Sequence, residues 1–113
     1  HYGVGEVQTA MTNIQVGIID NWIRHIKDVY RFHKKELDSI SNEQERFDRF
    51  VELNVFEQVQ DLAKTSIIQN AWEHNQEIHL HGWVYGINNG IIKDLDITLR
   101  DNHSLEAVDQ IGI

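Results

Sequence analysis

Apolar residues recur at steps of three and four through most of the first 75 positions. Such a step places side chains on one face of an amphipathic helix. It predicts a short helix at about residues 6–13 and a longer one at about residues 20–37. The apolar face of the longer helix is formed by Ile19, Trp22, Ile23, Ile26, Val29 and Tyr30.

The helical period continues from about residue 42 to residue 75. Ser41 and Gln44 have the spacing of a capping box, which marks the start of this segment. An uninterrupted helix of that length would exceed a normal globular helix. We therefore expect breaks near Asn54 and near residues 65–66, with Thr65 capping the last part.

The period changes in the segment EIHLHGWVYGINNGIIKDLDITL. Ile78, Leu80 and the β-branched residues around them favour strands. The tripeptide NNG between two apolar runs is a hairpin signal. We expect a β-hairpin at about residues 77–99, followed by a short helix that starts at Ser104. Together these elements predict one domain of the α/β or α+β class over residues 1–113.

Composition narrows the classes of partner. The chain has 113 residues, 41% hydrophobic residues and a net charge of −8. That charge argues against nucleic acid and anionic membranes, because both attract a surplus of Lys and Arg. No apolar run approaches the roughly 18 residues of a membrane span, and no signal-peptide pattern is present, so a cytoplasmic location is expected. Cysteine is absent, which excludes thiolate ligands and nucleophiles within these residues.

Two of the seven histidines invite a metal hypothesis. His79 and His81 are two positions apart, so they share one face of a strand. A pair of this kind holds zinc only when one or two further ligands join it. The simpler interpretation, which we favour, buries His81 beside Gly82 and Trp83 and leaves His79 on the surface.

The other candidate groups favour ordinary structural roles. His25 and His33 are two turns apart on the predicted helix and cannot share a metal, and His74 ends a helix, where a cation is mildly favourable. Glu52, Glu57 and Asp61 could act as acids or bases, but they are expected on the solvated face of an amphipathic helix. No phosphate-binding loop, dinucleotide fingerprint or Ser/His/Asp arrangement occurs.

The first seven residues, HYGVGEV, look like a metal-ligand loop. They combine a His with glycines that permit unusual backbone angles. Position 4, where a second ligand would be sought, is Val. From these residues alone the loop is either the remains of a metal site or a loop that never held one.

Four longer stretches decide between these interpretations: HYGVGEVQTAM, GIIDNWIRHIKDVY, ELNVFEQVQDLAKTSIIQNAW and HGWVYGINNGIIKDLDI. In this order and spacing they resemble the C-terminal half of a β-class carbonic anhydrase of the bacterial branch, from His1 to about Ile97. The resemblance implies an α/β fold, here a mostly helical C-terminal portion plus the hairpin. The N-terminal half of that fold is not present in this chain.

Members of this family interconvert carbon dioxide and bicarbonate at a zinc held by two Cys, one His and an Asp or water. The resemblance matches His1 to the zinc His, Val4 to the second zinc Cys, and Gly5 to a glycine whose backbone borders the substrate. Glu6 stands where the family has a second glycine. Val4 cannot coordinate a metal, so zinc is expected to be weak or absent and the chain alone inactive or strongly impaired. We expect no catalytic residue within this chain.

Two further expectations follow from the resemblance. Tyr85 matches a Tyr that binds an inhibitory bicarbonate in some bacterial members, but within this chain we favour the simpler interpretation, a strand aromatic in the core or at an interface. The sheet-facing side chains of Ile67, Ile68 and Trp72 would be exposed without another chain, which predicts a homodimer or a larger oligomer. The alternative function is a non-catalytic relative that acts through self-association or by binding a partner.

Overall fold

The computed structural model describes residues 1–2, 7 and 20–111 of the chain. The helix expected at residues 6–13 lies outside the described residues except for Val7, whose side chain is buried. The other helices and the two strands follow in the order α2 Asp20–Phe32, α3 Lys34–Asp38, α4 Glu43–Ala63, α5 Ser66–Glu73, β1 Leu80–Tyr85, β2 Ile92–Leu99 and α6 Asn102–Ile111. This is the mostly helical arrangement with one hairpin that the sequence predicts.

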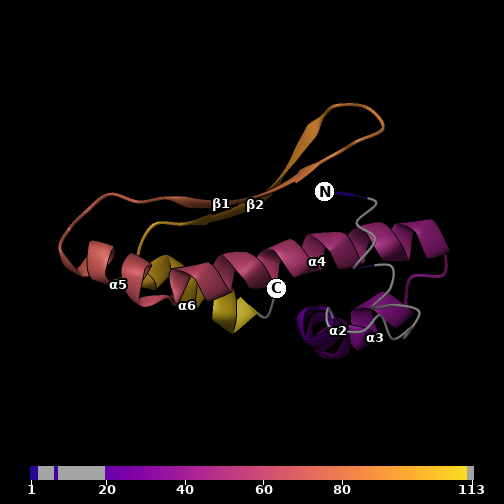
Figure 1. Ribbon diagram of the computed structural model, residues 1–113, viewed down its shortest axis with the longest axis horizontal. Helices are drawn as coiled ribbons and strands as arrows, with labels where there is room; N and C mark the ends of the chain where they lie inside the picture. The colour runs from indigo at the N-terminus through magenta and orange to yellow at the C-terminus, as the bar shows by residue number, and fades with distance from the viewer. Residues whose placement is uncertain (3–6, 8–19, 112–113) are drawn as a thin grey trace.

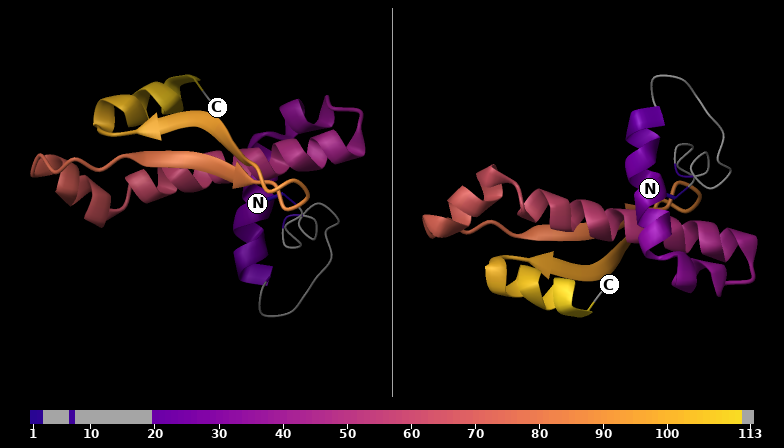
Figure 2. Two further views of the ribbon diagram at one scale, coloured as in Figure 1. Left: turned by 90° about the horizontal axis from the view of Figure 1, so that it is seen from above. Right: turned by 90° about the horizontal axis from the view of Figure 1, so that it is seen from below.

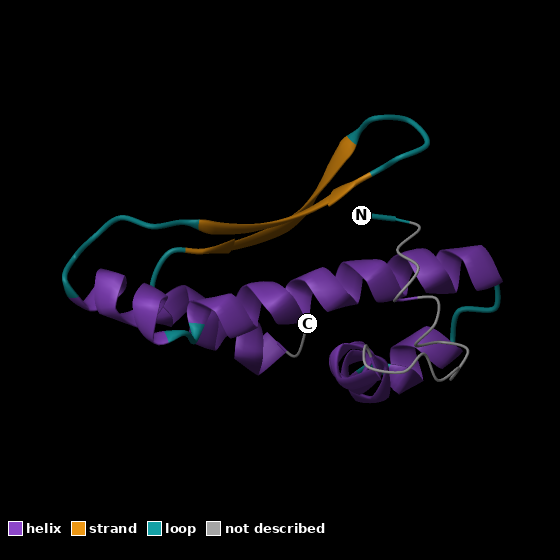
Figure 3. Ribbon diagram, in the orientation of Figure 1, coloured by secondary structure: helices purple, strands orange, loops and turns teal. Residues whose placement is uncertain are grey.

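Helix α4 is the central helix, and most of the other elements pack against it. The hairpin lies along one side of α4, and α2 and α3 lie on the other side near its N-terminal end (Figure 1). Figure 2 shows that α2 runs across α4 rather than along it, and that α6 lies beside β2. Figure 3 shows that most of the regular structure is helical and that the strands form a single two-stranded sheet. No helix of the described part is long and apolar enough to cross a membrane.

The break expected near Asn54 is wrong, because α4 runs without interruption from Glu43 to Ala63. Leu53 and Phe56, on either side of that position, are buried, and their burial stabilises a continuous helix. The break near residues 65–66 is confirmed, and Thr65 is the N-cap residue of α5. Its hydroxyl donates to the Leu62 carbonyl at 2.7 Å instead of capping α5.

The start of α4 also differs from the predicted capping box. Asn42, not Ser41, is the N-cap residue, and its side-chain oxygen accepts from the Glu45 N–H at 2.9 Å. The Gln44 side chain turns to Asp48 at 3.0 Å. Asn is as good an N-cap as Ser, so the prediction placed the helix correctly and chose the neighbouring residue.

The helix expected at residues 20–37 divides at His33 into α2 and α3. The apolar spacing that predicted the helix ends at Tyr30, and Phe32 at the end of α2 is 75% exposed. The division lets Leu37 turn inward, where it is fully buried. Helical hydrogen bonds are kept on both sides of the division, from the His33 N–H to the Val29 carbonyl at 3.1 Å and from the Leu37 N–H to the His33 carbonyl at 2.9 Å.

The predicted hairpin is confirmed. Strand β1 pairs antiparallel with β2, from Leu80 opposite Leu99 to Tyr85 opposite Ile92, with an irregularity between His81 and Trp83. Gly90 in the connecting turn has φ of 69°, a backbone angle that glycine adopts at little cost. The C-terminal helix α6 begins at Asn102 rather than at Ser104.

Burial alternates along β1. Leu80, Gly82 and Val84 face α4 and are buried, whereas the residues between them are exposed. At Gly82 an added Cβ would lie 2.5 Å from Ile97 Cγ2 and 3.5 Å from Val55 Cγ1. The close packing of Ile97 of β2 against β1 thus depends on the absence of a side chain at Gly82, whereas α4 would be in ordinary contact with such a side chain.

The apolar surface expected around α5 is partly present. Ile67 is 77% exposed, as predicted. Ile68 is buried, and Trp72 is half-buried with its indole N–H donating to the Ile78 carbonyl at 3.0 Å. The exposure predicted for Ile68 and Trp72 is therefore wrong, because the segment leading into β1 and the core of this chain cover them.

Candidate functional site

The N-terminal histidine presents one free ring nitrogen. His1 is exposed, and its Nδ1 lies 2.9 Å from the Tyr2 carbonyl oxygen. A carbonyl only accepts, so Nδ1 carries the hydrogen in this contact. In the neutral ring the lone pair is then on Nε2, which is the atom that a metal would bind.

Tyr2 attaches this segment to two different elements. Its backbone N–H donates to the carbonyl of Tyr85 at the end of β1, at 3.3 Å. Its hydroxyl donates to Glu52 Oε2 of α4 at 2.6 Å. The structure thus brings the predicted site residues His1 and Tyr85 close together through Tyr2, although Tyr85 itself is 49% exposed on the outer side of the hairpin.

Glu52 is a buried carboxylate with three donors around it. Besides the Tyr2 hydroxyl, Lys93 Nζ lies 2.8 Å from Oε2 and Arg49 Nη1 lies 3.2 Å from Oε1. Arg49 also contacts Glu36 Oε2 at 2.6 Å, which extends the cluster to α3. The solvated position expected for Glu52 is therefore wrong.

Burial and hydrogen bonding act in opposite directions on this carboxyl. Burial alone would raise the pKa of Glu52, but the hydrogen bonds from Lys93 and Tyr2, with help from Arg49, leave the pKa below its usual range. Burial, together with the hydrogen bond to Glu52, raises the pKa of Tyr2. The pair is thus a neutral phenol donating to an ionised carboxylate.

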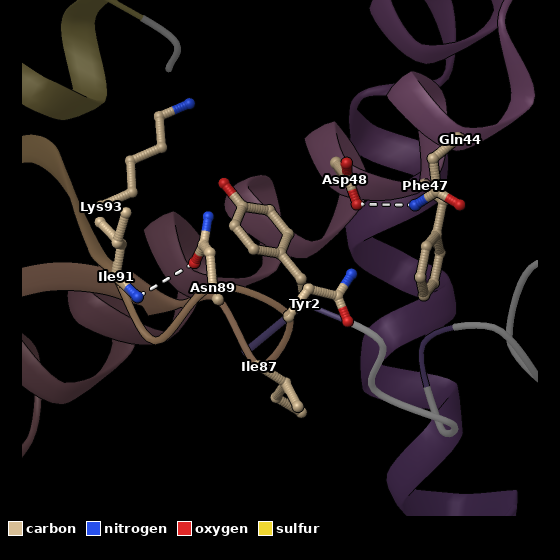
Figure 4. Close-up of a pocket in the computed structure, with 10 residues that line it drawn as sticks. Tyr2, Gln44, Phe47, Asp48, Ile87, Asn89, Ile91 and Lys93 are labelled. Atoms are coloured by element: carbon tan, nitrogen blue, oxygen red, sulfur yellow. Dashed lines mark hydrogen bonds between the residues drawn. The ribbon is translucent and has the colours of Figure 1, made fainter.

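A cavity of about 650 Å³ opens next to this cluster. Tyr2 lies between the hairpin turn and the first turns of α4 (Figure 4). Asn89 Oδ1 accepts from the Ile91 N–H across the turn, and Gln44 pairs with Asp48 on α4. The cation on the wall, Lys93, is already paired with Glu52, and the Asp48 carboxylate on the wall accepts from the neutral Gln44 amide.

A second hollow, of about 760 Å³, contains both His1 and His81. Its floor is apolar, formed by Val55, Val59 and Leu62 of α4. His81 is exposed rather than buried, which corrects the expectation for that residue. Its Nδ1 lies 3.1 Å from Thr98 Oγ1 and its ring stacks on Trp83 with centroids 5.9 Å apart.

Four other histidines lie in places where they have no evident role in a metal site. His79 is exposed as expected, with its ring 6.4 Å from that of His81 on the same side of the strand. His33 Nε2 contacts Glu57 Oε1 at 3.0 Å, while His25 lies on the exposed side of α2. His74 ends α5, as predicted, and its Nδ1 contacts the Asn70 carbonyl at 2.8 Å.

Among the described residues, His1 is the predicted metal ligand. In the described ranges 1–2, 7 and 20–111, no three His, Asp or Glu side chains gather where one ion could bind. Val4, Gly5 and Glu6 lie outside the described residues. Valine has no donor atom in any conformation, so His1 contributes a single imidazole where a stable zinc site needs at least three protein ligands.

Comparison with known proteins identifies the family. Residues 1–92 match the family model described as carbonic anhydrase. A carbonic anhydrase from Emericella nidulans is 47% identical over 97 residues, which is 86% of this chain and 42% of that protein. The chain belongs to the carbonic anhydrase family.

Solved structures place it in the β class. The Coccomyxa β-carbonic anhydrase, in complex with acetazolamide, aligns with a TM-score of 0.85 and 27% identity over 95% of this chain and 49% of that one. A tetrameric β-carbonic anhydrase from Sordaria macrospora gives 0.76 and 32% over 88% of this chain and 50% of the other. That of Aspergillus fumigatus gives 0.78 and 28%, covering 97% and 52%. The chain spans about half the length of these relatives.

Proposed function

We propose that this chain is the C-terminal portion of a β-class carbonic anhydrase, an enzyme of reversible carbon dioxide hydration, with an incomplete zinc site. The observation that carries the proposal is the loop HYGVGE, in which His1 keeps a donor and Val4 has none. The chain alone is then inactive or strongly impaired. It contains no catalytic residue of its own, and of the zinc ligands that the family resemblance implies it supplies His1 alone.

The geometry around His1 supports its role as the remaining metal ligand. Its Nδ1 donates to the Tyr2 carbonyl, and His1 lines a hollow together with Val55, Val59 and Leu62. A hydrogen bond from one ring nitrogen to a neighbouring acceptor is the usual way to orient a histidine that binds a metal through the other nitrogen. We propose the Gly5 backbone as the substrate contact. This contact stays a prediction, and so does the weak or absent binding of zinc.

Two finer parts of the proposal concern regulation and origin. Tyr85 is a candidate for an inhibitory bicarbonate site, supported by its exposed ring beside the turn at Gly90. The relatives named above include fungal proteins and give no support to the bacterial branch, so we do not extend the proposal to it. The cytoplasmic location stays a prediction for cell fractionation to test.

A non-catalytic function through self-association is the second candidate. The exposed aromatic side of β1, with Trp83 at 53% and Tyr85 at 49%, supports a surface that another protein covers. A solved relative is described as tetrameric, which supports self-association of this chain as well.

Carbon dioxide hydration by the chain and by its Val4→Cys variant tests the proposal. We expect no zinc-dependent turnover by the chain, and at least about tenfold tighter zinc binding once a thiolate joins His1. Val108→Cys is the matched control, because it adds a thiol on α6, which does not line the hollow of His1. Zinc-dependent turnover by the unaltered chain would contradict the incomplete site.

In a longer form that includes the upstream segment, Val4→Cys separates the two candidates. Recovered hydration indicates an enzyme disabled at one ligand. Unchanged inactivity, with zinc bound, indicates a scaffold that has changed further and favours the non-catalytic function.

A further inference from the structure

We propose that Glu52 is a positioning residue that fixes the orientation of His1 by anchoring Tyr2 to helix α4. The inference rests on the proposed function, because that function gives His1 its role. It concerns a residue of the long helix that has no metal-ligand or substrate role in the proposal above. The sequence pattern had assigned Glu52 to the solvent-facing side of the helix.

The first argument is the burial of Glu52. Glu52 is only 7% exposed. Among the described residues, Glu52 and Gln60 are the only buried polar or charged ones. Burying a carboxylate costs free energy unless several donors surround it. A carboxylate retained at such a position indicates that its contacts are specific.

The second argument is the origin of its donors. Tyr2 comes from the N-terminal segment, Lys93 from β2 and Arg49 from α4 itself. Lys93 and Tyr2 converge on the same oxygen, Oε2, at 2.8 and 2.6 Å. Glu52 therefore joins three parts of the chain that are distant in sequence.

The third argument is the short path from Glu52 to the His1 ring. The carboxylate holds the Tyr2 hydroxyl, and the end of β1 holds the Tyr2 backbone through the Tyr85 carbonyl. With Tyr2 fixed at both its side chain and its N–H, its carbonyl oxygen has a defined position. That oxygen holds His1 Nδ1 at 2.9 Å and leaves Nε2 free. Releasing the Tyr2 ring would free the carbonyl and with it the His1 ring.

Nuclear magnetic resonance of the chain tests this directly and needs neither zinc nor activity. The nitrogen shifts of the His1 imidazole report which ring nitrogen carries the hydrogen, and backbone relaxation reports the order of the Tyr2 amide. In the unaltered chain we expect the hydrogen on Nδ1 and a Tyr2 order parameter near ~0.85, the value of rigid backbone. Spectra are recorded near ~pH 8.5, well above the ordinary histidine pKa, so that the ring is neutral.

The variants are Glu52→Ala and Tyr2→Phe, which remove the hydrogen bond from either side. In both we expect the Tyr2 order parameter to fall below about 0.6 and His1 to become a mixture of tautomers. Glu57→Gln is the matched control, because it removes a carboxylate of the same helix that pairs with His33 instead. It should leave Tyr2 and His1 unchanged.

Tyr2→Phe keeps the aromatic ring and loses one hydroxyl, so it keeps the test decisive if Glu52→Ala unfolds. A native Tyr2 order parameter and a native His1 tautomer in folded Tyr2→Phe would overturn the proposal. A mobile Tyr2 in the unaltered chain would overturn it too. The zinc and hydration assays above can fail independently of these spectra, so the two proposals are distinguishable.

Discussion

The two faces of the hairpin differ in how far they are buried. The inner face, with Leu80, Val84 and Leu99, is fully packed against α4 and α6. The outer face carries His81, Trp83 and Tyr85, which are exposed on the same strand. Neighbouring residues therefore alternate between a completed core and an uncovered aromatic surface.

The difference shows which part of the family fold is self-sufficient. The helices of this chain are sufficient to bury the inner-face side chains. Outer-face residues are large and apolar enough to be buried, and the described residues do not cover them. Substitutions on the inner face should thus act on folding, and those on the outer face on assembly.

The largest effect is expected from the inner face. Leu99 is fully buried, and Leu99→Ala should lower the free energy of unfolding by about 2–5 kcal/mol, because it leaves a cavity between β2 and the helices. Urea unfolding measures it. Thr98→Ala, next along the strand and exposed, is the control and should change the free energy by less than about 1 kcal/mol. Equal losses in the two variants would remove the distinction between the faces.

Gly82 tests how closely the two strands of the hairpin pack on their inner face. Gly82→Ala places a methyl group 2.5 Å from Ile97 Cγ2, and the overpacking should cost about 1–3 kcal/mol. Thermal unfolding of this variant, of Ile97→Ala and of the double variant forms a cycle. The double variant should lose less than the sum, because Ile97→Ala removes the clashing atom. Strict additivity would mean that the two side chains do not meet.

Glu52 should stabilise the molecule through its charge, by about 1–3 kcal/mol at neutral pH relative to Glu52→Gln. The pKa of Glu52 is lower in the folded state than in the unfolded chain. Its contribution is therefore complete above the ordinary glutamate pKa of about 4.3 and is lost as the pH falls through the folded pKa. Unfolding free energies of the two proteins should converge as the pH is lowered through this range. A constant difference at every pH would show that the charge is not the cause.

The smallest effect on folding is expected from the outer face. Trp83→Ser should change the free energy of unfolding of a dilute chain by less than about 1 kcal/mol, since Trp83 is 53% exposed. It should nevertheless weaken self-association, because it removes an apolar ring from the uncovered face. Light scattering at micromolar concentration measures the mass. An unchanged mass in Trp83→Ser, or a monomer in the unaltered chain, would count against the assembly role of this face.

Most of the fold was predictable because periodicity reports burial. The hairpin, the length of the helical region and the break before Ser66 all follow from apolar spacing and turn residues. The errors are at places where tertiary packing decides. Asn54 stays within α4 because Leu53 and Phe56 are buried, and the helix divides at His33 so that Leu37 can be buried.

The candidate site was predictable only in part. The resemblance predicts the roles of His1 and Val4, whereas the contact that occupies Nδ1 of His1 depends on the local backbone conformation, which the sequence pattern does not show. Glu52 was missed because its partners Tyr2 and Lys93 lie 50 and 41 positions away. One signal was present in the sequence: Glu52 lies between Val51 and Leu53, both buried, with Arg49 one helical turn earlier.

Zinc content tests the central claim most directly. The purified chain is dialysed exhaustively and its zinc per chain is measured by elemental analysis. The account predicts essentially no zinc, because His1 is a lone imidazole and Val4 has no donor atom. Close to one zinc per chain would contradict it, and would mean that ligands outside the described residues, or from another chain, complete the centre.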